Sequence, residues 1–166
     1  MNDATGITFR PATPADVPAI FEIRTAVREH AMTMEQLAAE GITPASVVKS
    51  MASERRGWVA QNAQGQIVAF AVASVKSNFI FGLFTRPGWE GRGCGTALLH
   101  AAATHLFDAG AEVVWLTTNP SSRAAEFYRR RGWSAAGQGD KGELRFELKR
   151  PPTRAATLSQ NRPRGR

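Results

Sequence analysis

The spacing of apolar side chains changes at Gly57 from a helical period to the period of strands. Before that residue, apolar positions recur every three or four residues from Val17 to Ala31. This predicts an amphipathic helix, with Thr13 as its N-cap and Pro14 as its first residue. A short strand is expected ahead of this helix and two shorter helices after it, over residues 7–10, 33–40 and 44–53.

After Gly57, short apolar runs alternate with two further helical patterns. The run from Phe79 to Phe84 is apolar on both faces, as a central strand is. Gly82 within it marks either a bulge or a weak strand position. The helices are expected over residues 95–109 and 123–131, and the strands over residues 58–60, 67–75, 79–84, 113–117, 133–136 and 144–148. This order of elements predicts a single α/β domain built on a mixed sheet.

Charge changes this picture at the C-terminus. The net charge of the 166 residues is +7, but residues 1–148 carry only +1, because no acid follows Glu147 and six basic residues do. These are Lys149, Arg150, Arg154, Arg162, Arg164 and Arg166. We therefore divide the chain into a domain over residues 1–149 and a basic tail over residues 150–166. The tail is expected to be disordered, because it is rich in proline and glycine and Leu158 is its only large apolar side chain.

Several classes of partner and compartment are disfavoured. The tail has no aromatic side chain to stack on a base, so we do not expect nucleic acid to be a partner. No apolar stretch approaches the roughly 20 residues of a membrane span, and the N-terminus lacks a signal-peptide pattern. Cys94 is the only cysteine and the three histidines are scattered, so neither an intrachain disulfide nor a metal site is predicted. We expect a cytoplasmic protein.

Three glycines, Gly91, Gly93 and Gly95, follow a buried strand and open a helix. Glycine lets backbone N–H groups approach a phosphate closely, and a helix N-terminus adds unpaired donors and partial positive charge. Arg92 adds a full charge, so the loop suits a pyrophosphate. A Walker loop is excluded because no lysine precedes Thr96, and a dinucleotide fingerprint would need a glycine at that same position.

Two segments resemble the motifs of the GNAT acetyltransferases. Residues 83–87 and 90–95 resemble the strand, glycine loop and helix start of motif A, and residues 121–133, with Phe127-Tyr128 and Gly132-Trp133, resemble motif B. The resemblance covers about residues 7–148. It departs from the usual pattern at Glu90, where glutamine or arginine is commoner, and at Ser121, where asparagine is commoner.

The resemblance implies a mostly antiparallel central sheet flanked by helices, and an acetyl group passed directly from acetyl-CoA to a primary amine. The donor-binding residues that it implies are Phe84, Thr85, Gly91, Arg92, Gly93, Cys94, Gly95, Thr96 and Ser121. A backbone N–H near Phe84 or Thr85 would polarise the thioester carbonyl. The three arginines that follow Tyr128 could contact phosphate, but a charged run on one short helix is usually solvated.

The resemblance assigns Tyr128, the only tyrosine, as the general acid that protonates the leaving thiolate. The alternative is that it only packs the helix onto the sheet. For the general base, Glu29 near the end of the first helix is our candidate. A solvated glutamate, with a water relaying the proton, is the alternative.

The predicted function is therefore N-acetylation of an amine. The alternatives are a non-catalytic CoA-binding regulatory module and a nucleic-acid-associated protein that acts through its tail. The sequence does not identify the acceptor, which is a small-molecule or peptide amine: a metabolite, an antibiotic, a polyamine, or a protein lysine or N-terminus. A homodimer is left open.

Overall fold

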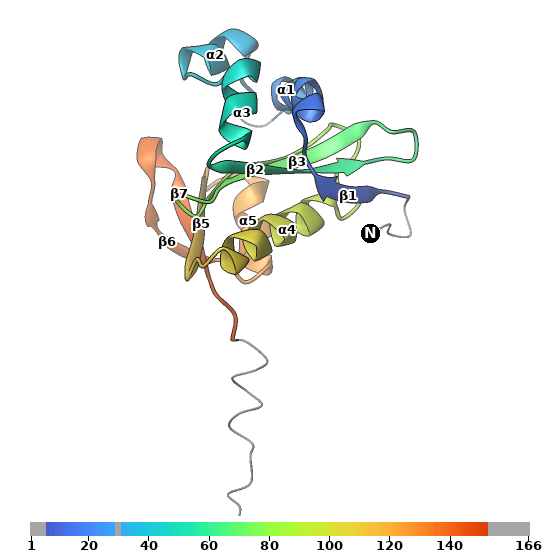
Figure 1. Cartoon of the computed structure of the whole chain (residues 1–166). Helices are drawn as coiled ribbons and strands as arrows, with labels where there is room; N and C mark the ends of the chain where they lie inside the picture. The colour runs from blue at the N-terminus through green and yellow to red at the C-terminus, as the bar shows by residue number, and fades with distance from the viewer. Residues whose placement is uncertain (1–5, 29–30, 153–166) are drawn as a thin grey trace, which may run out of the picture.

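A seven-stranded sheet forms the centre of the computed structural model, which describes residues 6–28 and 31–152 (Figure 1). Within these residues the strand order is β1-β2-β3-β4-β5-β7-β6, and every neighbouring pair is antiparallel except β4 and β5. The strands are β1 Thr8–Pro11, β2 Arg55–Gln61, β3 Ile67–Ser74, β4 Phe79–Thr85, β5 Val113–Thr118, β6 Ser134–Gln138 and β7 Leu144–Lys149. The predicted mixed, mostly antiparallel sheet is confirmed.

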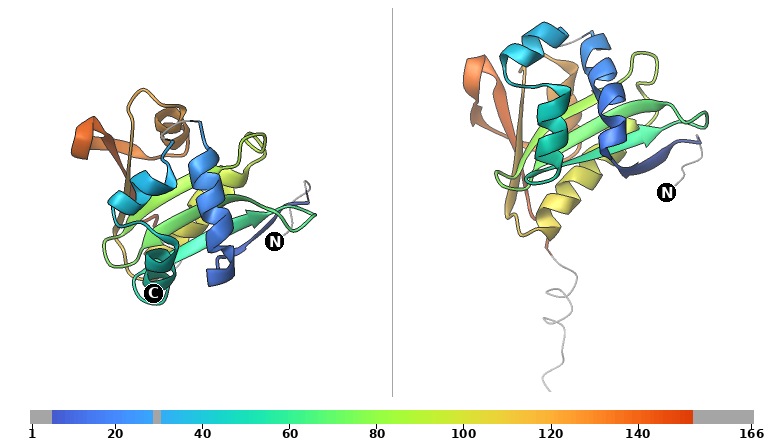
Figure 2. Two further views of the ribbon diagram at one scale, coloured as in Figure 1. Left: turned by 90° about the horizontal axis from the view of Figure 1, so that it is seen from above. Right: turned by 45° about the horizontal axis from the view of Figure 1, so that its top comes forward.

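Helices cover both faces of this sheet. The first three lie on one face, and α4 and α5 lie on the other (Figures 1 and 2). The α-helices are α1 Val17–Ala26, α2 Met34–Ala39, α3 Pro44–Met51, α4 Cys94–Asp108 and α5 Arg123–Arg130, with short 3-10 helices at Pro14–Asp16 and Asp140–Gly142. All five α-helices were expected, with small differences at most ends.

The expectation that the first helix continues to Ala31 is wrong. α1 ends at Ala26, and Val27 is extended, with φ −66° and ψ 148°. Val27 packs against the cluster formed by Ile20, Ile23 and neighbouring sheet residues, so tertiary packing overrides the helical spacing at this end. Glu29, our candidate general base, lies outside the described residues.

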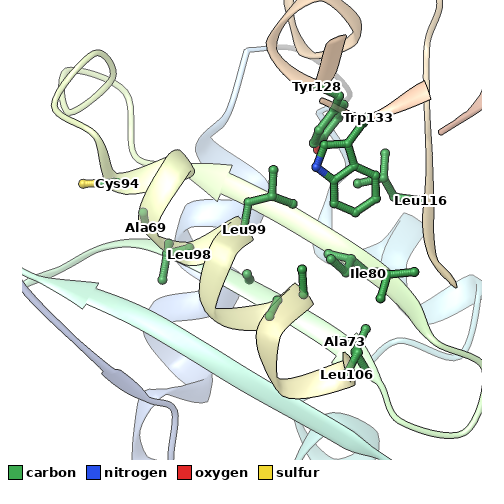
Figure 3. Packing of buried hydrophobic residues seen from close by; sticks show 14 of the residues in the cluster. Ala69, Ala73, Ile80, Cys94, Leu98, Leu99, Leu106, Leu116, Tyr128 and Trp133 are labelled. Atoms are coloured by element: carbon green, nitrogen blue, oxygen red, sulfur yellow. The ribbon is translucent and has the colours of Figure 1, made fainter. Parts of the chain in front are cut away.

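The main core lies between α4 and the sheet. Small side chains on β3, among them Ala69 and Ala73, let α4 approach closely, so that Leu98 and Leu106 are fully buried (Figure 3). The predicted buried face of this helix is confirmed at all five positions: Leu98, Leu99, Ala102, Ala103 and Leu106. This packing fixes the glycine loop, because the loop leads directly into α4.

The two parallel strands at the centre of the sheet touch at one end only. β4 and β5 pair at Phe79 and Trp115, where the Trp115 N–H donates to the Asn78 carbonyl at 3.1 Å and the indole N–H to the Ser77 carbonyl at 2.9 Å. Beyond this point β4 pairs only with β3, and β5 only with β7. Their carboxyl ends therefore separate and leave a gap in the sheet.

A bulge interrupts β4 beside this gap. Val72 on β3 faces Gly82, but the next residue, Ala73, faces Ile80, so Phe81 has no partner across the strand pair. A Cβ at Gly82 would lie 3.0 Å from the ring of Phe84. Of the two readings of Gly82, the bulge is confirmed.

The last described residues are tied to the domain. Arg150, which the sequence placed in the tail, donates from its backbone N–H to the Glu112 carbonyl at 2.9 Å. Its guanidinium donates to the carbonyls of Phe107 and Ala111, at 2.6 and 3.1 Å, where α4 ends. Arg150 therefore belongs to the fold. Residues 153–166 of the predicted tail lie outside the described residues.

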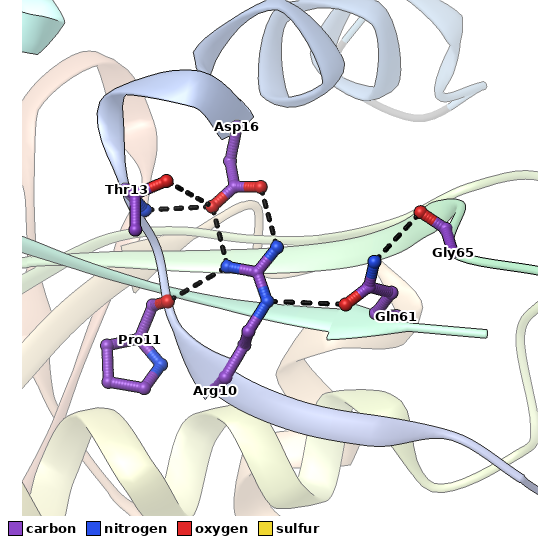
Figure 4. A network of polar contacts seen from close by, with 6 residues as sticks. All are labelled: Arg10, Pro11, Thr13, Asp16, Gln61 and Gly65. Carbon is purple, nitrogen blue, oxygen red and sulfur yellow. Dashed lines mark hydrogen bonds and ion pairs between the residues drawn. The ribbon is translucent and has the colours of Figure 1, made fainter. Parts of the chain in front are cut away.

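A polar network holds the start of the chain to the sheet (Figure 4). The Arg10 guanidinium donates to both carboxylate oxygens of Asp16, each at 2.8 Å, and Asp16 also accepts from the backbone N–H of Thr13. Asp16 is only 6% exposed. The hydrogen bond from Arg10 lowers the pKa of this carboxyl against the opposing effect of burial.

We predict that Asp16→Asn lowers the free energy of unfolding by about 1.5–3 kcal/mol, because charge-assisted hydrogen bonds are lost in a partly buried site. The folded-state pKa of Asp16 lies below its unfolded value, so its contribution is complete above about pH 4 and is lost as pH falls through the folded pKa. Urea titrations of both proteins between pH 2.5 and 7 measure this.

Asp108→Asn is the matched control, because Asp108 is exposed at the end of α4. Its stability is expected to stay within about 0.5 kcal/mol of the parent. A stability difference between the parent and Asp16→Asn that stays constant down to pH 2.5 would contradict the lowered pKa.

Candidate active site

The gap between β4 and β5 presents backbone groups that no strand satisfies. The Arg86 N–H donates to the Val68 carbonyl on β3 at 2.7 Å, and by alternation the Phe84 N–H also points to β3. The N–H and C=O groups of Leu83 and Thr85 then point to the other side, towards β5. Because β5 pairs with β4 only at Phe79, these groups line the gap. Thr85, rather than Phe84, is thus placed to donate to a ligand there.

The glycine loop lies where β4 leads into α4. Gly91 and Gly93 have φ of +74° and +84°, a conformation that L-residues adopt with strain, and Gly93 is the N-cap of α4. A Cβ on Gly93 would meet no described atom within 4 Å, so the space in front of the loop is open. A Cβ on Gly95 would lie 3.3 Å from the Phe127 ring, so this glycine allows α5 to pack closely.

The Glu90 carboxylate accepts from the backbone N–H of Gly88 at 2.8 Å and so closes the turn at the start of the loop. The residue that departs from the usual motif is therefore engaged within the loop itself. Arg92 is exposed and its guanidinium carbon lies 4.4 Å from the ring centre of Trp89, while the thiol of Cys94 is buried. Cys94 thus offers a ligand only its backbone.

Ser121 and Tyr128 approach from the other side of the gap, where β5 leads into α5. The Ser121 hydroxyl donates to Asn119 Oδ1 at 2.8 Å, and both residues follow the carboxyl end of β5. The carboxyl ends of the parallel strands β4 and β5 lie at one edge of the gap. Ser121 therefore lies at the same edge of the sheet as the glycine loop, on a separate segment of the chain.

The ring of Tyr128 is buried in the core, with ring centres 5.8 Å from Phe146 and 5.9 Å from Trp133 (Figure 3). Burial raises the pKa of Tyr128 to about 12, so the hydroxyl stays protonated at neutral pH. No described side-chain nitrogen or oxygen is both fully buried and without a hydrogen bond. No hydrogen bond joins this hydroxyl to another described residue, so it reaches the molecular surface.

Arg131 contacts the start of α4, whereas the sequence placed it in a solvated run. Its Nε and Nη2 donate to the Thr96 hydroxyl at 2.9 and 2.7 Å, and its guanidinium carbon lies 3.5 Å from the ring centre of Phe127. It therefore reaches from the end of α5 to the first turn of α4. Its neighbour Arg130 instead pairs with Glu126 one turn earlier. Only the contact with Thr96 distinguishes Arg131 from the adjacent Arg130, so no signal in the sequence could have identified it.

A groove lies beside this contact. It has a volume of about 360 Å³ and runs along the outer side of α4, from Thr96 and Arg131 to Lys149 and Pro151. It meets the donor loop only at Thr96, so it is a neighbour of the gap rather than part of it. No group of three potential metal ligands occurs in residues 6–28 and 31–152.

A model of the acetyltransferase (GNAT) family matches residues 22–133. The chain belongs to the GNAT acetyltransferase family. A search of curated proteins found no match. The resemblance that the sequence motifs indicated is thus confirmed.

Solved GNAT structures share the fold. The PaiA N-acetyltransferase of Thermoplasma acidophilum, in complex with coenzyme A, is 15% identical, with 87% of this chain and 99% of that chain covered and a TM-score of 0.72. YncA of Salmonella typhimurium, with its cofactor acetyl-CoA, is 16% identical, with 87% of this chain and 94% of that chain covered and a TM-score of 0.69. The ribosomal-protein-S18-alanine N-acetyltransferase of Escherichia coli is 18% identical, with 86% of this chain and 93% of that chain covered and a TM-score of 0.67. No helix within the described ranges is long and apolar enough to cross a membrane.

We predict that Gly93→Ala weakens CoA binding by about tenfold or more, because the new methyl group enters the open space where a phosphate would approach. Isothermal titration with CoA measures the change. The positive φ of Gly93 adds a strain cost of about 1–2 kcal/mol to folding, which a thermal melt reports separately.

Gly88→Ala is the matched control. Gly88 also has a positive φ, +93°, and a Cβ added to it would meet no described atom within 4 Å, but it precedes the phosphate-binding turn. It is expected to lower the melting temperature similarly and leave CoA affinity nearly unchanged. Equal loss of affinity in both variants would show that loop strain, and not phosphate contact, is measured.

Proposed function

We propose that this GNAT protein transfers an acetyl group from acetyl-CoA to a primary amine by direct attack. The observation that carries the proposal is the gap between β4 and β5, with the glycine loop after β4 and the helix that bears Tyr128 after β5. A gap with unpaired backbone donors suits the amide-containing arm of CoA, and the loop suits its pyrophosphate.

In this proposal, the donor phosphates bind the backbone N–H groups of the loop. The residues involved are Gly91, Arg92, Gly93, Cys94, Gly95 and Thr96. The arm of CoA then extends along β4 as an added strand, and exchanges hydrogen bonds with Leu83 and Thr85. The Thr85 N–H is a donor to the thioester carbonyl, whose oxygen gains negative charge as the amine attacks. Ser121 contributes a contact from the α5 side.

The chemical step moves one acetyl group and one proton. The amine nitrogen attacks the carbonyl carbon, the C–S bond breaks, and the nitrogen loses one proton to water while the sulfur gains one from Tyr128. Water then returns a proton to Tyr128, so that one proton passes overall from the nitrogen to the sulfur. The pKa of Tyr128 is about 12, whereas the pKa of a thiol in water is near 8.5. Complete transfer of the proton from Tyr128 to the sulfur would therefore cost about 5 kcal/mol if the thiol were in water. The donor fills the gap and removes that water, which raises the thiol pKa towards that of Tyr128.

In this scheme, no single base is needed to deprotonate the acceptor amine. Glu22 on α1 is engaged with Arg86 by an ion pair, so its carboxylate already has a partner. Glu29 stays a prediction, since it lies outside the described residues. A water chain from the gap to solvent serves the same purpose, and the rate then rises with pH as the free amine deprotonates.

The competing reading is a CoA-binding module without turnover. A panel of primary amines with acetyl-CoA separates the two, when release of the CoA thiol and the mass of the acetylated product are followed together. Amine-dependent thiol release with acetylated product supports the enzyme. Tight CoA binding without product from any amine supports the module.

Tyr128→Phe keeps the ring and removes only the hydroxyl. We predict a kcat lower by roughly 10²–10⁴ when thiolate protonation limits the rate, with a smaller change in the KM for acetyl-CoA. Because the pKa of Tyr128 is about 12, the parent enzyme should show no fall in rate from its ionisation below about pH 11.

The measurement is a pH–rate profile of both proteins, with single-turnover kinetics to identify the chemical step. A thermal melt checks that the aromatic packing is intact. An unchanged single-turnover rate would leave Tyr128 as a packing residue.

Arg131→Gln tests whether this arginine binds a donor phosphate. The described residues place no carboxylate in an ion pair with it, and it bonds to Thr96 at the first turn of α4. Loss of a charge-assisted contact should weaken CoA binding about tenfold. Titrations with CoA and with dephospho-CoA show which phosphate is involved.

Arg130→Gln removes the same charge from the neighbouring position, where the side chain pairs with Glu126. Its CoA affinity should stay within about twofold of the parent, because an exposed i,i+4 ion pair contributes little. If both variants weakened CoA binding equally, Arg131 would act only through its long-range charge and not through a direct contact with phosphate.

A further inference from the structure

Arg86, the residue directly after β4, has a largely buried side chain. It is 15% exposed, although arginine is one of the residues most often found at the surface. The guanidinium donates from Nε and Nη2 to the Ile67 carbonyl on β3, at 3.2 and 3.0 Å, and from Nη1 to the Glu22 carboxylate on α1. All three nitrogens of the group are therefore engaged with the protein itself, on the face of the sheet that α1 covers (Figures 1 and 2).

The main chain of Arg86 is fixed as well. Its N–H donates to the Val68 carbonyl at 2.7 Å, and its carbonyl accepts from the Trp89 N–H at 3.0 Å, which closes the turn that leads into the glycine loop. Main chain and side chain thus hold Arg86 to two successive residues of β3, Ile67 and Val68. Arg86 therefore links the end of β4 to β3, to α1 and to the start of the donor loop.

The strand end that Arg86 fixes is held along one edge only. Thr85 pairs with Ala69 in the last pair between β4 and β3, whereas β5 pairs with β4 only at Phe79, at the other end of the strand. Backbone at the end of a strand opens more readily than backbone in its middle. A rotation about the strand axis would turn the Thr85 N–H away from the gap, so the bonds of the adjacent Arg86 restrict the direction of this N–H.

The donor loop has supports of its own. The Glu90 carboxylate accepts from the Gly88 N–H at 2.8 Å, and α4 is anchored in the main core by Leu98 and Leu106. The turn at Arg86 is closed by main-chain atoms, which a change of its side chain leaves in place. Removal of the guanidinium is thus expected to affect the Thr85 N–H more than the loop.

We propose that Arg86 is a positioning residue for acetyl transfer, whose guanidinium keeps the Thr85 N–H directed at the thioester carbonyl while Glu22 holds the guanidinium in place. This inference rests on the proposed function. Arg86 contacts neither the donor nor the acceptor and acts only through Thr85. A small displacement of a donor weakens its bond to an oxygen that gains negative charge, and positioned donors of this kind contribute strongly to rate.

Infrared spectroscopy of the bound donor reads this hydrogen bond directly. Acetyl-CoA labelled with carbon-13 at the thioester carbonyl is bound to the parent and to Arg86→Met without an acceptor, and its band is isolated by difference from unlabelled acetyl-CoA. A stronger hydrogen bond lowers the stretching frequency of a carbonyl. We expect the band in Arg86→Met to lie at a higher frequency and to be broader than in the parent, because the Thr85 N–H is less well directed.

Kinetics and calorimetry measure the consequence for the reaction. With the amine of the panel that is acetylated fastest, Arg86→Met should lower the single-turnover rate by about tenfold to a hundredfold. Its Kd for CoA, which has no thioester carbonyl, should stay within about twofold of the parent. A purely structural role would lower the melting temperature and leave both the carbonyl band and the single-turnover rate unchanged.

Arg56→Met is the matched control. Arg56 is also half-buried, and its guanidinium also donates to main-chain carbonyls, with the shortest bond, 2.8 Å, to Arg55. Arg56 pairs with Ala73 on β3, which faces Ile80 near the start of β4, so it lies at the other end of that strand from Thr85. The variant is expected to lose stability to a similar extent, to keep the carbonyl band of the parent, and to react within about twofold of the parent rate.

Two further variants separate the parts of the contact. Arg86→Lys keeps the charge but replaces the planar fork with one ammonium group, so its band and rate should lie between those of the parent and Arg86→Met. Arg86→Met also releases the Glu22 carboxylate, so the double variant with Glu22→Gln is measured beside it and should match it. A double variant with the rate of the parent would assign the loss to the released carboxylate and overturn the inference.

The outcomes distinguish this inference from the function on which it rests. A band that is unchanged in Arg86→Met, or that changes equally in Arg56→Met, would overturn the inference and leave acetyl transfer intact. A loss of CoA affinity as large as the loss of rate would also overturn it, because the donor loop would then be disturbed. A band that shifts in Arg86→Met alone, in a protein that acetylates no amine, would support the role of Arg86 at Thr85 and overturn the proposed reaction.

Discussion

The single pairing of β4 with β5 is the constraint on which the rest of the structure depends. Hydrogen bonds from the Trp115 backbone and indole to the turn before β4 fix the two strands at one end, and β3 and β7 occupy their outer edges. The inner edges beyond Phe79 therefore carry unpaired backbone groups in the middle of a sheet. Such groups are costly unless water or a ligand satisfies them, so the same topology that opens the sheet also specifies a strand-like ligand.

The motifs were sufficient to predict the fold and the position of the glycine loop. Glycine spacing located the loop before α4, and the period of apolar residues located the buried face of that helix, because both signals are local in sequence. The end of α1 was missed because Val27 leaves the helical path to pack on a cluster that includes Ile23 and residues far along the chain. The contact of Arg131 was missed for a similar reason. This residue is distinguished from Arg130 only by a hydroxyl 35 residues earlier, on Thr96.

On the α4 side of the sheet, Arg131 reaches from the end of α5 to the Thr96 hydroxyl at the start of α4. The proposed reaction needs these two helices close together, because the glycine loop opens α4 and Tyr128 lies on α5. A sheet closed between β4 and β5 would keep the two helices in contact and lose the gap that the proposal uses.

The three carbonyls that hold Arg150 have a consequence for handling the protein. They belong to the end of α4 and the turn after it, whereas the donor loop lies at the start of the same helix. Fifteen helical residues separate the two ends, or about 22 Å. An affinity tag, a fluorescent fusion partner or a tether to a solid support placed after Pro152 therefore leaves the domain at the far end of α4, and the mouth of the donor site stays clear of it.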